Sequence, residues 1–300
     1  MYTNLDLFAL LMDLTSKFQK LEVNCSTDLG GKEEYVRHFI MKFRVFRSII
    51  TLARRAKRIW KTTSDFRNLK LVREIPKFFR QYLRFKFSEG KVDSIYPILS
   101  DFKLDAGVVG GHYFHQDLRV AQLIYEDNPD RHIDVGSRID GFVAHVASFR
   151  EIEVFDIRPL ANCAHSNIVF QQVDIMNQSE LAFADSISCL HALEHFGLGR
   201  YGDDINPEGH LIGFRNLIQM LKAGGRLYVS FPIGNSDRVL FNAHRVFNPR
   251  SILDWVSEDL VLEFFDYVDD KGEFHSEEKL SDFSSSLNYG CGIYTFRKSI

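Results

Sequence analysis

The chain of 300 residues contains little cysteine, and its four cysteines lie far apart in the sequence. They form neither the close pairs that ligate zinc nor the framework of a small disulfide-linked domain, which is typical of a reducing compartment. The cysteines are Cys25, Cys163, Cys189 and Cys291. Long apolar runs are also missing, because no uncharged stretch approaches the roughly 20 residues that cross a bilayer. Residues 1–30 have no signal-peptide pattern, so we expect a cytoplasmic protein.

The chain has little net charge, since the formal value is −3, but the charges are unevenly distributed. Residues 31–90 hold 17 Lys/Arg against 5 Asp/Glu. Their apolar side chains recur at helical spacing, which predicts a basic amphipathic helix. Three interpretations stay open: a helix packed on the remainder of the chain or on a second copy in a homo-oligomer, a peripheral contact with the inner face of a membrane, or binding to nucleic-acid phosphates. We favour packing and then membrane contact, because no base-reading motif indicates nucleic acid.

The spacing of apolar residues changes near residue 95, which divides the chain into two regions. Residues 1–95 are predicted to be a helical, basic N-terminal region. Residues 96–300 alternate apolar strands with amphipathic helices, which is typical of an α/β, doubly wound sheet covered on both faces. Helices are expected at 112–127, 142–149, 210–225 and 251–258, and strands at 132–135, 152–157, 168–175, 184 to about 190, 226–234, 260–268 and 291–299. Gly224 and Gly225 are taken as the stop signal of the third helix.

Acidic residues end three successive predicted strands, at Asp134, Asp156 and Asp174. Ligands of an open parallel sheet bind beyond the carboxyl ends of its strands. Asp156 is placed to accept hydrogen bonds from both hydroxyls of a ribose, and Asp174 to accept one from the exocyclic amine of an adenine. Each acid alone also suits a helix N-cap. Together with Gly136 they predict a cofactor that contains adenosine.

The turn DVGSRIDG has too few glycines for a dinucleotide. A pyrophosphate needs the G-x-G-x-x-G pattern to approach the backbone and the helix N-terminus. Arg138 and Asp140 put side chains where that diphosphate would lie, and Asp140 would repel it. S-adenosylmethionine has no phosphate, and its zwitterionic end and positive sulfonium suit Asp134, Arg138 and Asp140 better. The sequence therefore favours S-adenosylmethionine over a dinucleotide.

A polar loop, LHALEHFGLGRYGD, follows the fourth predicted strand. The candidate general bases for a hydroxyl acceptor are His191, His195, His244 and Asp203. We favour His195, with Glu194 orienting its imidazole. The residues that are candidates to bind a polar acceptor are Arg200, Tyr201, His244 and Arg245. A hydrogen-bonded structural role is equally open for each histidine, and for Arg245 a salt bridge with an acid of the sheet.

The stretch HALEH within this loop matches the H-x-x-E-H pattern of some zinc peptidases. That chemistry needs the histidines on one face of a helix and a further ligand on another element. Here the stretch follows a strand and runs into FGLGRYG, which ends any helix early. We therefore expect no metal.

Taken in order, the motifs resemble those of class I S-adenosylmethionine-dependent methyltransferases. The matching stretches are DVGSRIDG, FDIRP, VDI, LHALEHFGLGRYGD and LKAGGRLYVSFPIG. More narrowly, GHYFHQDL, IDVGSRIDGF, EHFGLGRYGD and FNAHRVF resemble a domain-of-unknown-function family with a methyltransferase-like core, met among polysaccharide-biosynthesis genes. The resemblance covers about residues 95–300 and implies a Rossmann-like sheet of seven strands with a reversed last strand.

The resemblance also assigns roles to residues. Those assigned to the cofactor are Asp134, Gly136, Ser137, Arg138, Asp156, Asp174 and Ile175. Asp134, Gly136 and Ser137 would line its methionine end. Those placed where such enzymes close over the cofactor and substrate are Tyr113, His115 and Gln116.

The expected function is O-methylation of a polar small molecule or saccharide in glycan assembly, with S-adenosylmethionine as the cofactor. The alternative is a catalytically silent binding protein with the same fold in a glycan-assembly complex, because Arg138 and Asp140 replace two glycines of the methyltransferase turn. A nucleotide-sugar oxidoreductase is a third interpretation, which the missing diphosphate glycines disfavour.

Overall fold

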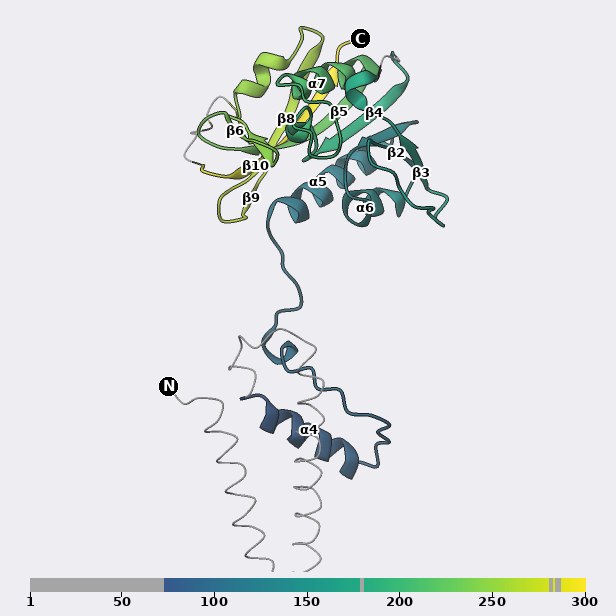
Figure 1. Cartoon of the computed structure of the whole chain (residues 1–300), viewed down its shortest axis with the longest axis vertical. Helices are drawn as coiled ribbons and strands as arrows, with labels where there is room; N and C mark the ends of the chain where they lie inside the picture. The colour runs from purple at the N-terminus through teal and green to yellow at the C-terminus, as the bar shows by residue number, and fades with distance from the viewer. Residues whose placement is uncertain (1–72, 179–180, 281–282, 284–286) are drawn as a thin grey trace, which may run out of the picture. The chain divides into compact units, whose positions relative to one another are not determined.

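The computed structural model describes residues 73–178, 181–280, 283 and 287–300. The chain divides into two compact units, residues 1–104 and 105–300 (Figure 1). The boundary expected near residue 95 stays a prediction. Most of the basic segment 31–90, including its predicted amphipathic helix, lies outside the described residues.

The described part of the first unit contains α4 (Ile75–Phe87) and the short 3-10 helix η1 (Asp101–Lys103). A proline in the first turn of α4 is tolerated because no intrahelical bond needs its missing N–H. Arg84 and Lys86 in the last turn face the negative end of the helix dipole. α4 lies within the region 1–95 that is predicted to be helical. In the ranges that the structure describes, no helix combines the length and the apolar character needed to cross a membrane.

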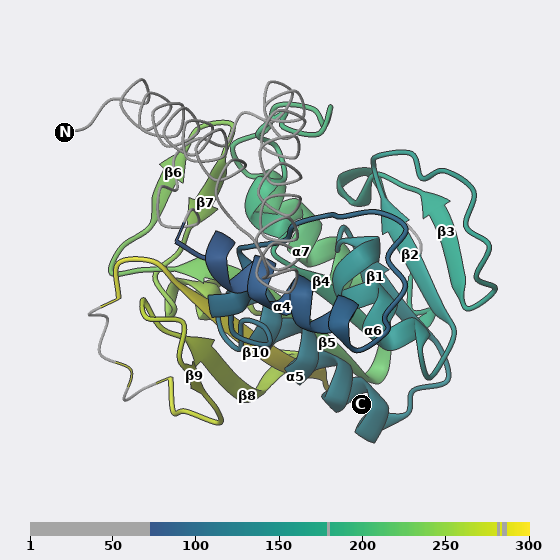
Figure 2. The ribbon, with the colours of Figure 1, turned by 90° about the horizontal axis from the view of Figure 1, so that it is seen from below.

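The second unit is built on one large sheet, which has eight strands in the described part of the chain. Their order is β3-β2-β1-β4-β5-β10-β8-β9. Figure 2 shows β3 at one edge and β8 and β9 at the other. The strands are β1 (His132–Val135), β2 (Ile152–Asp156), β3 (Ile168–Gln172), β4 (Ala184–Leu190), β5 (Leu221–Ile233), β8 (Leu260–Val268), β9 (Phe274–His275) and β10 (Gly290–Lys298).

The strand directions match the predicted architecture. β1 to β5 pair in parallel, whereas β10 inserts between β5 and β8 and runs antiparallel to both. This is the seven-stranded sheet with a reversed last strand, extended at the edge by the two-residue β9. The predicted fold class, an α/β doubly wound and mostly parallel sheet, is confirmed.

Helices cover both faces of the sheet, with α5 (His112–Asp127) and α6 (Ala144–Ala147) on one side and α7 (Gly209–Met220) on the other (Figure 1). Successive strand residues point to opposite faces. On β5, Leu227 and Val229 therefore join the apolar cluster that contains the residues of α7, while Tyr228 joins the cluster that contains those of α5 and α6. Because both faces are buried, the strands read as nearly continuous apolar runs.

Three of the four predicted helices differ from the observed ones. The helix expected at 142–149 begins earlier, with a π-turn η2 (Ile139–Val143) whose Gly141 is non-helical, and continues as α6. The helix expected to run to Gly225 ends at Met220, and β5 begins at the next residue. Gly224 has a φ of 76° and lies where the pairing of β4 with β5 shifts register. The glycine pair therefore marks a bulge of the sheet rather than a helix stop.

Smaller elements join the strands and were not all predicted. The predicted helix at 251–258 is a 3-10 helix, η5 (Ser251–Trp255). The other 3-10 turns are η3 (Ile175–Asn177) and η4 (Leu193–His195). An unpredicted hairpin, β6 (Arg238–Leu240) with β7 (His244–Val246), forms a separate two-stranded sheet.

Candidate functional site

A cavity lies where the chain leaves the carboxyl ends of β1, β2, β3 and β4, and it encloses about 520 Å³ including its open mouth. The chain runs from β1 toward β3 on one side and from β4 toward β5 on the other, so the cavity sits at the switch point of the sheet, where ligands of such folds bind. The predicted site residues that line it are Gly136, Asp156, Asp174, Ile175, His191, His195, Tyr201 and Asp203.

Gly136 forms the floor of the cavity at the end of β1. Its φ is 75°, a conformation that L side chains rarely adopt. A Cβ at this position would lie 2.9 Å from the Cβ of Ala192, and the Gly136 N–H donates to the carbonyl of Phe155 at 2.9 Å. Only glycine lets the turn after β1 pass this close to the loop after β4.

We expect Gly136→Ala to lower the free energy of unfolding by about 1–3 kcal/mol, because it adds left-handed strain to a clash with Ala192. Urea denaturation measures the change. Gly107→Ala is the matched control, since a Cβ there meets no atom within 4 Å. Equal stability of the two variants would show that the turn tolerates a side chain.

Asp134 lies beneath this turn and does not line the cavity. Its fully buried carboxyl accepts hydrogen bonds from Ser137 Oγ at 2.8 Å, Ser188 Oγ at 2.6 Å and the Ser137 N–H at 3.1 Å. Burial raises the pKa of Asp134 to about 7, against the lowering effect of these hydrogen bonds. The expectation that Asp134 and Ser137 contact the cofactor stays a prediction; in the structure their side chains bind each other and stabilise the turn.

Arg138 and Asp140 also lie outside the cavity lining. The guanidinium binds the carboxylate through Nε at 3.0 Å and a terminal nitrogen at 2.8 Å, and both side chains are more than 70% exposed, at 72% and 74%. The expectation that they occupy the position of a diphosphate stays a prediction, and their mutual pairing leaves both side chains at the surface.

Asp156 lines the cavity at the end of β2, and its carboxylate is held by Arg158. The Arg158 guanidinium donates to the two carboxylate oxygens at 2.9 and 2.5 Å, and the Arg158 backbone N–H donates at 2.8 Å. The guanidinium also lies over the ring of Tyr201, 4.6 Å from its centroid. A pair of ribose hydroxyls would take the place of these guanidinium donors. Sequence reasoning missed Arg158, although it stands in the quoted FDIRP motif.

Asp174 lines the cavity after β3 and also caps η3. Its carboxylate accepts from the Met176 N–H at 2.9 Å and from Asn177 Nδ2 at 2.7 Å. Asp174 therefore acts as the N-cap of η3 in this structure, as one of the two interpretations predicted. Each carboxylate oxygen keeps a further acceptor position, so a ligand amine in the cavity can still be bound.

Glu194, His191 and His195 form a buried group at the start of the loop after β4. The Glu194 side chain is 2% exposed; its Oε1 lies 3.0 Å from His191 Nδ1 and 3.7 Å from His195 Nε2. The expectation that Glu194 orients His195 is therefore corrected, because its hydrogen bond goes to His191. His195 is held by the Ala243 carbonyl, 2.7 Å from its Nδ1.

The contacts of His195 leave it suited to accept a proton. Donation from Nδ1–H to the Ala243 carbonyl places the free lone pair on Nε2. Burial lowers the pKa of His195 below its ordinary value, against the carboxylate of Glu194, which raises it. The imidazole is thus neutral at neutral pH and lines the cavity.

Asp203 and Arg245 organise the loop. The Asp203 carboxylate accepts from the backbone N–H groups of three loop residues, at 2.8, 3.1 and 3.2 Å. Arg245 is 3% exposed and donates to the carbonyls of Glu194, Phe196 and Pro207. Neither predicted role of Arg245, acceptor binding or a salt bridge with the sheet, matches this position. Asp203 also lines the cavity, but its oxygens already hold the loop.

Five other predicted residues are not among those that line the cavity: Tyr113, His115, Gln116, Arg200 and His244. Gln116 is buried and accepts from Ser230 Oγ at 2.6 Å, so it is part of the packed interior. The ring of His115 stacks on Phe274. Tyr113 is 60% exposed and lies against His191. Two further rings stand beside His195: His244 and Tyr201, which Arg200 also contacts.

The sheet order and the cavity at its switch point define a Rossmann-like, doubly wound fold. Residues 164–284 match the family described as Caenorhabditis protein of unknown function, DUF268. A search of the curated proteins found no match.

Several solved structures are similar. The N-methyltransferase NodS from Bradyrhizobium japonicum WM9, in complex with S-adenosylhomocysteine, is 15% identical over 62% of this chain and 87% of its own, with a TM-score of 0.43. A Burkholderia thailandensis 1,6-didemethyltoxoflavin-N1-methyltransferase is 14% identical over 66% and 94%, with a TM-score of 0.43. The [4+2]-cyclase SpnF is 16% identical over 61% and 82%, with a TM-score of 0.47. Methyl transfer and cyclisation both occur among these names, and a fold does not fix a reaction.

Proposed function

We propose that this chain is an S-adenosylmethionine-dependent methyltransferase that acts on a polar small molecule or saccharide. The observation that carries the proposal is the joint position of Asp156 and Asp174, which line one cavity with the glycine turn at Gly136. The first carboxylate is placed for ribose hydroxyls and the second for an adenine amine. The saccharide and its place in glycan assembly are supported by the sequence resemblance.

The loop after β4 supplies the polar groups on the other side of the cavity. When bound, the cofactor would supply an electrophilic methyl group on a sulfonium. The chain's own task is to align an acceptor in line with the carbon–sulfur bond and to exclude water. As the acceptor oxygen forms its bond to the methyl carbon and the electron pair of the breaking bond goes to sulfur, His195 Nε2 would take the acceptor's proton.

We expect His195→Ala to slow methyl transfer by about 10²–10⁴-fold, the usual contribution of a positioned base, and to leave the affinity for S-adenosylhomocysteine within about twofold. Transfer is measured with methyl-labelled cofactor and a panel of saccharide acceptors. His275→Ala is a control, because this histidine belongs to β9 and does not line the cavity. Full activity of His195→Ala would remove it as the base.

Calorimetry tests the cofactor. S-adenosylmethionine and S-adenosylhomocysteine should each bind, and NAD should give no heat, because the turn after β1 lacks the glycines that a pyrophosphate needs. S-adenosylhomocysteine is the first probe because it is the ligand named for NodS. Heat with NAD alone would overturn the proposal.

A second candidate is a silent binding protein with the same fold in a glycan-assembly complex. The two hydrogen bonds from the Arg158 guanidinium to Asp156 favour this candidate, because they already use the carboxylate oxygens that a ribose would need. This candidate predicts binding of a partner protein and no release of S-adenosylhomocysteine with any acceptor. Labelled product in the transfer assay decides between the two.

A further inference from the structure

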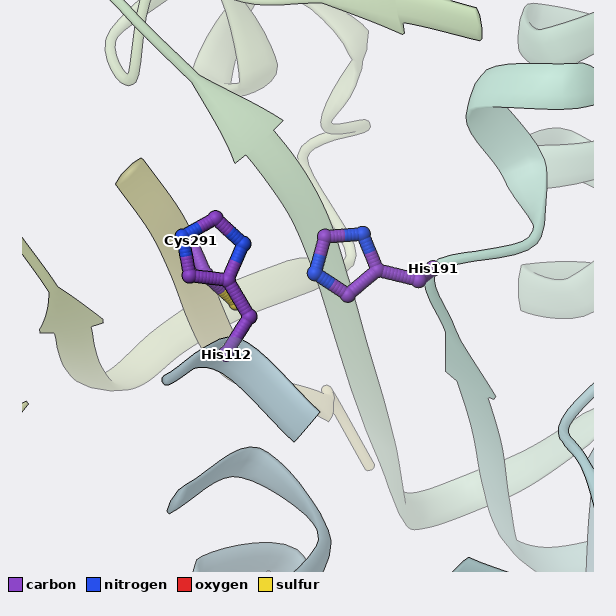
Figure 3. Close-up of side chains that lie close together, drawn as sticks. All are labelled: His112, His191 and Cys291. Carbon is purple, nitrogen blue, oxygen red and sulfur yellow. The ribbon is translucent and has the colours of Figure 1, made fainter. Parts of the chain in front are cut away.

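We propose that His112, His191 and Cys291 bind a divalent metal ion of the zinc class. The described residues contain two groups of side chains that are close enough to bind one metal ion, and these three residues form one of them. Their ring nitrogen and sulfur atoms all lie within 4.8 Å of one another. The residues come from three elements: the first residue of α5, the residue after β4 and the second residue of β10. Figure 3 shows the two imidazoles facing each other, with Cys291 on the strand beside them.

The spacing suits a tetrahedral ion. Zinc–nitrogen and zinc–sulfur bonds of about 2.0–2.3 Å place neighbouring ligand atoms roughly 3.3–3.7 Å apart. The three ligand atoms, which lie within 4.8 Å of one another, would have to move closer together to reach that separation. Two imidazoles and one thiolate form a donor set typical of zinc, and three protein ligands leave a fourth position for water or a substrate oxygen.

The state of His191 is the second, independent observation. Its side chain is 6% exposed, and its Nε2 has no hydrogen-bond partner among the described residues. Buried polar atoms are nearly always paired. Its other ring nitrogen, Nδ1, is 3.0 Å from Glu194 Oε1. Because Nδ1 faces this carboxylate, Nε2 is the ring nitrogen that is left for a metal.

The contact between Glu194 and His191 is the arrangement that supports metal ligands elsewhere. Histidine ligands usually donate their second ring N–H to a carboxylate or carbonyl, which fixes the tautomer and the ring direction. The imidazole of His112 interacts in a similar way with the backbone of Tyr289. His191 is therefore held from behind, by a group that does not itself bind the ion.

The backbone of His191 is strained at the same point. Its φ is 49°, in the left-handed region that non-glycine residues seldom occupy. Its N–H is fixed by the hydroxyl and the carbonyl of Ser230, at 3.0 and 3.1 Å. Such strain persists where the surrounding structure maintains it, most often at ligand sites. Here it directs the imidazole toward α5 and β10.

Cys291 completes the site from the far side. It is fully buried, and its thiol contacts are long, at 3.8 Å to Gln116 Oε1 and 3.9 Å to the Gly292 carbonyl. Sequence spacing gives no sign of this site, because the three ligands come from separate parts of the domain. The ligand set also differs from the H-x-x-E-H interpretation, since Glu194 and His195 are not ligands here.

Elemental analysis of the full chain, purified with zinc and then dialysed, tests the proposal. We expect about one equivalent of zinc per chain, since one ligand set binds one ion. Cys291→Ser, His112→Ala and His191→Ala should each lose nearly all of it. Cys163→Ser is the matched control and should keep it, because Cys163 lies at a half-buried position outside the group. Zinc-free wild-type protein would overturn the site.

Cobalt substitution supplies a readout that does not depend on a variant folding. Cobalt in the wild-type protein should show the ultraviolet charge-transfer absorption of a metal–thiolate bond, and Cys163→Ser should show it equally. Cobalt that binds without this absorption overturns the proposal. The proposal is also overturned if Cys291→Ser still binds the metal and His275→Ala does not. This result would assign the ion to the second group, Asp269, Glu273 and His275. Neither measurement uses S-adenosylmethionine, so its outcome is separate from that of the proposed function.

Discussion

Replacing Asp156 with alanine is expected to weaken binding of S-adenosylhomocysteine by about 10²–10³-fold. The carboxylate lines the cavity at the end of β2, where two ribose hydroxyls would donate to it. A hydrogen bond to a charged group contributes about 1.5–3 kcal/mol. The loss of two such bonds costs about 3–4 kcal/mol of binding free energy, because the ribose must first displace Arg158 from the carboxylate. Each step of about 1.4 kcal/mol changes the affinity tenfold. Calorimetry on the two proteins measures the change.

Two further variants make this measurement specific. Asp254→Ala removes an exposed carboxylate that does not line the cavity, and it should leave the affinity unchanged. Arg158→Ala frees the Asp156 carboxylate from its guanidinium, and it should tighten binding or leave it equal. An Asp156→Ala protein that binds as tightly as wild type would place the ribose elsewhere. A loss in Arg158→Ala as large as that in Asp156→Ala would make the guanidinium itself a ligand contact.

The fold was predictable from the sequence because its signals are local. The predicted bounds of α5, β1 and β8 match the structure, since the helix carries an amphipathic period and the strands are short apolar runs between turns. The end of α7 was not predictable in this way. A glycine pair suits a helix stop and a sheet bulge alike, and the choice depends on the pairing of β4 with β5, which no local pattern contains.

The same distinction applies to the site. Gly136, Asp156 and Asp174 reach the cavity because each directly follows or ends a strand, and a strand end is visible in the sequence. Their partners are not visible there. The roles of the buried Asp134 and of the three atoms proposed for a metal depend on contacts between distant segments. Glu194 and His191 are only three residues apart, but the sequence does not show that Glu194 contacts His191 rather than His195. The sequence shows which residues lie at a strand end, but it does not show their hydrogen-bond partners.

Arg245→Ala is expected to lower the free energy of unfolding by about 3–4 kcal/mol. The guanidinium donates to the carbonyls of Glu194 at 3.2 Å, Phe196 at 2.7 Å and Pro207 at 3.1 Å, so one side chain ties both ends of the loop after β4 to β7. Each buried polar group left without a partner costs about 1–3 kcal/mol, and water that enters the space offsets part of the total. Urea denaturation followed by circular dichroism measures the change.

Two comparisons separate the geometry of this guanidinium from its charge. Arg245→Lys keeps the charge, but an ammonium lacks the planar fork that reaches three carbonyls, so about half of the loss should remain. Arg238→Ala removes an exposed arginine of the same hairpin, which donates to one carbonyl, that of Asn288, and it should cost less than about 1 kcal/mol. If Arg245→Lys is as stable as wild type, a positive charge alone suffices at this position. If Arg245→Ala is as stable, the loop that carries His191, Glu194 and His195 is held by the backbone contacts of Asp203 instead.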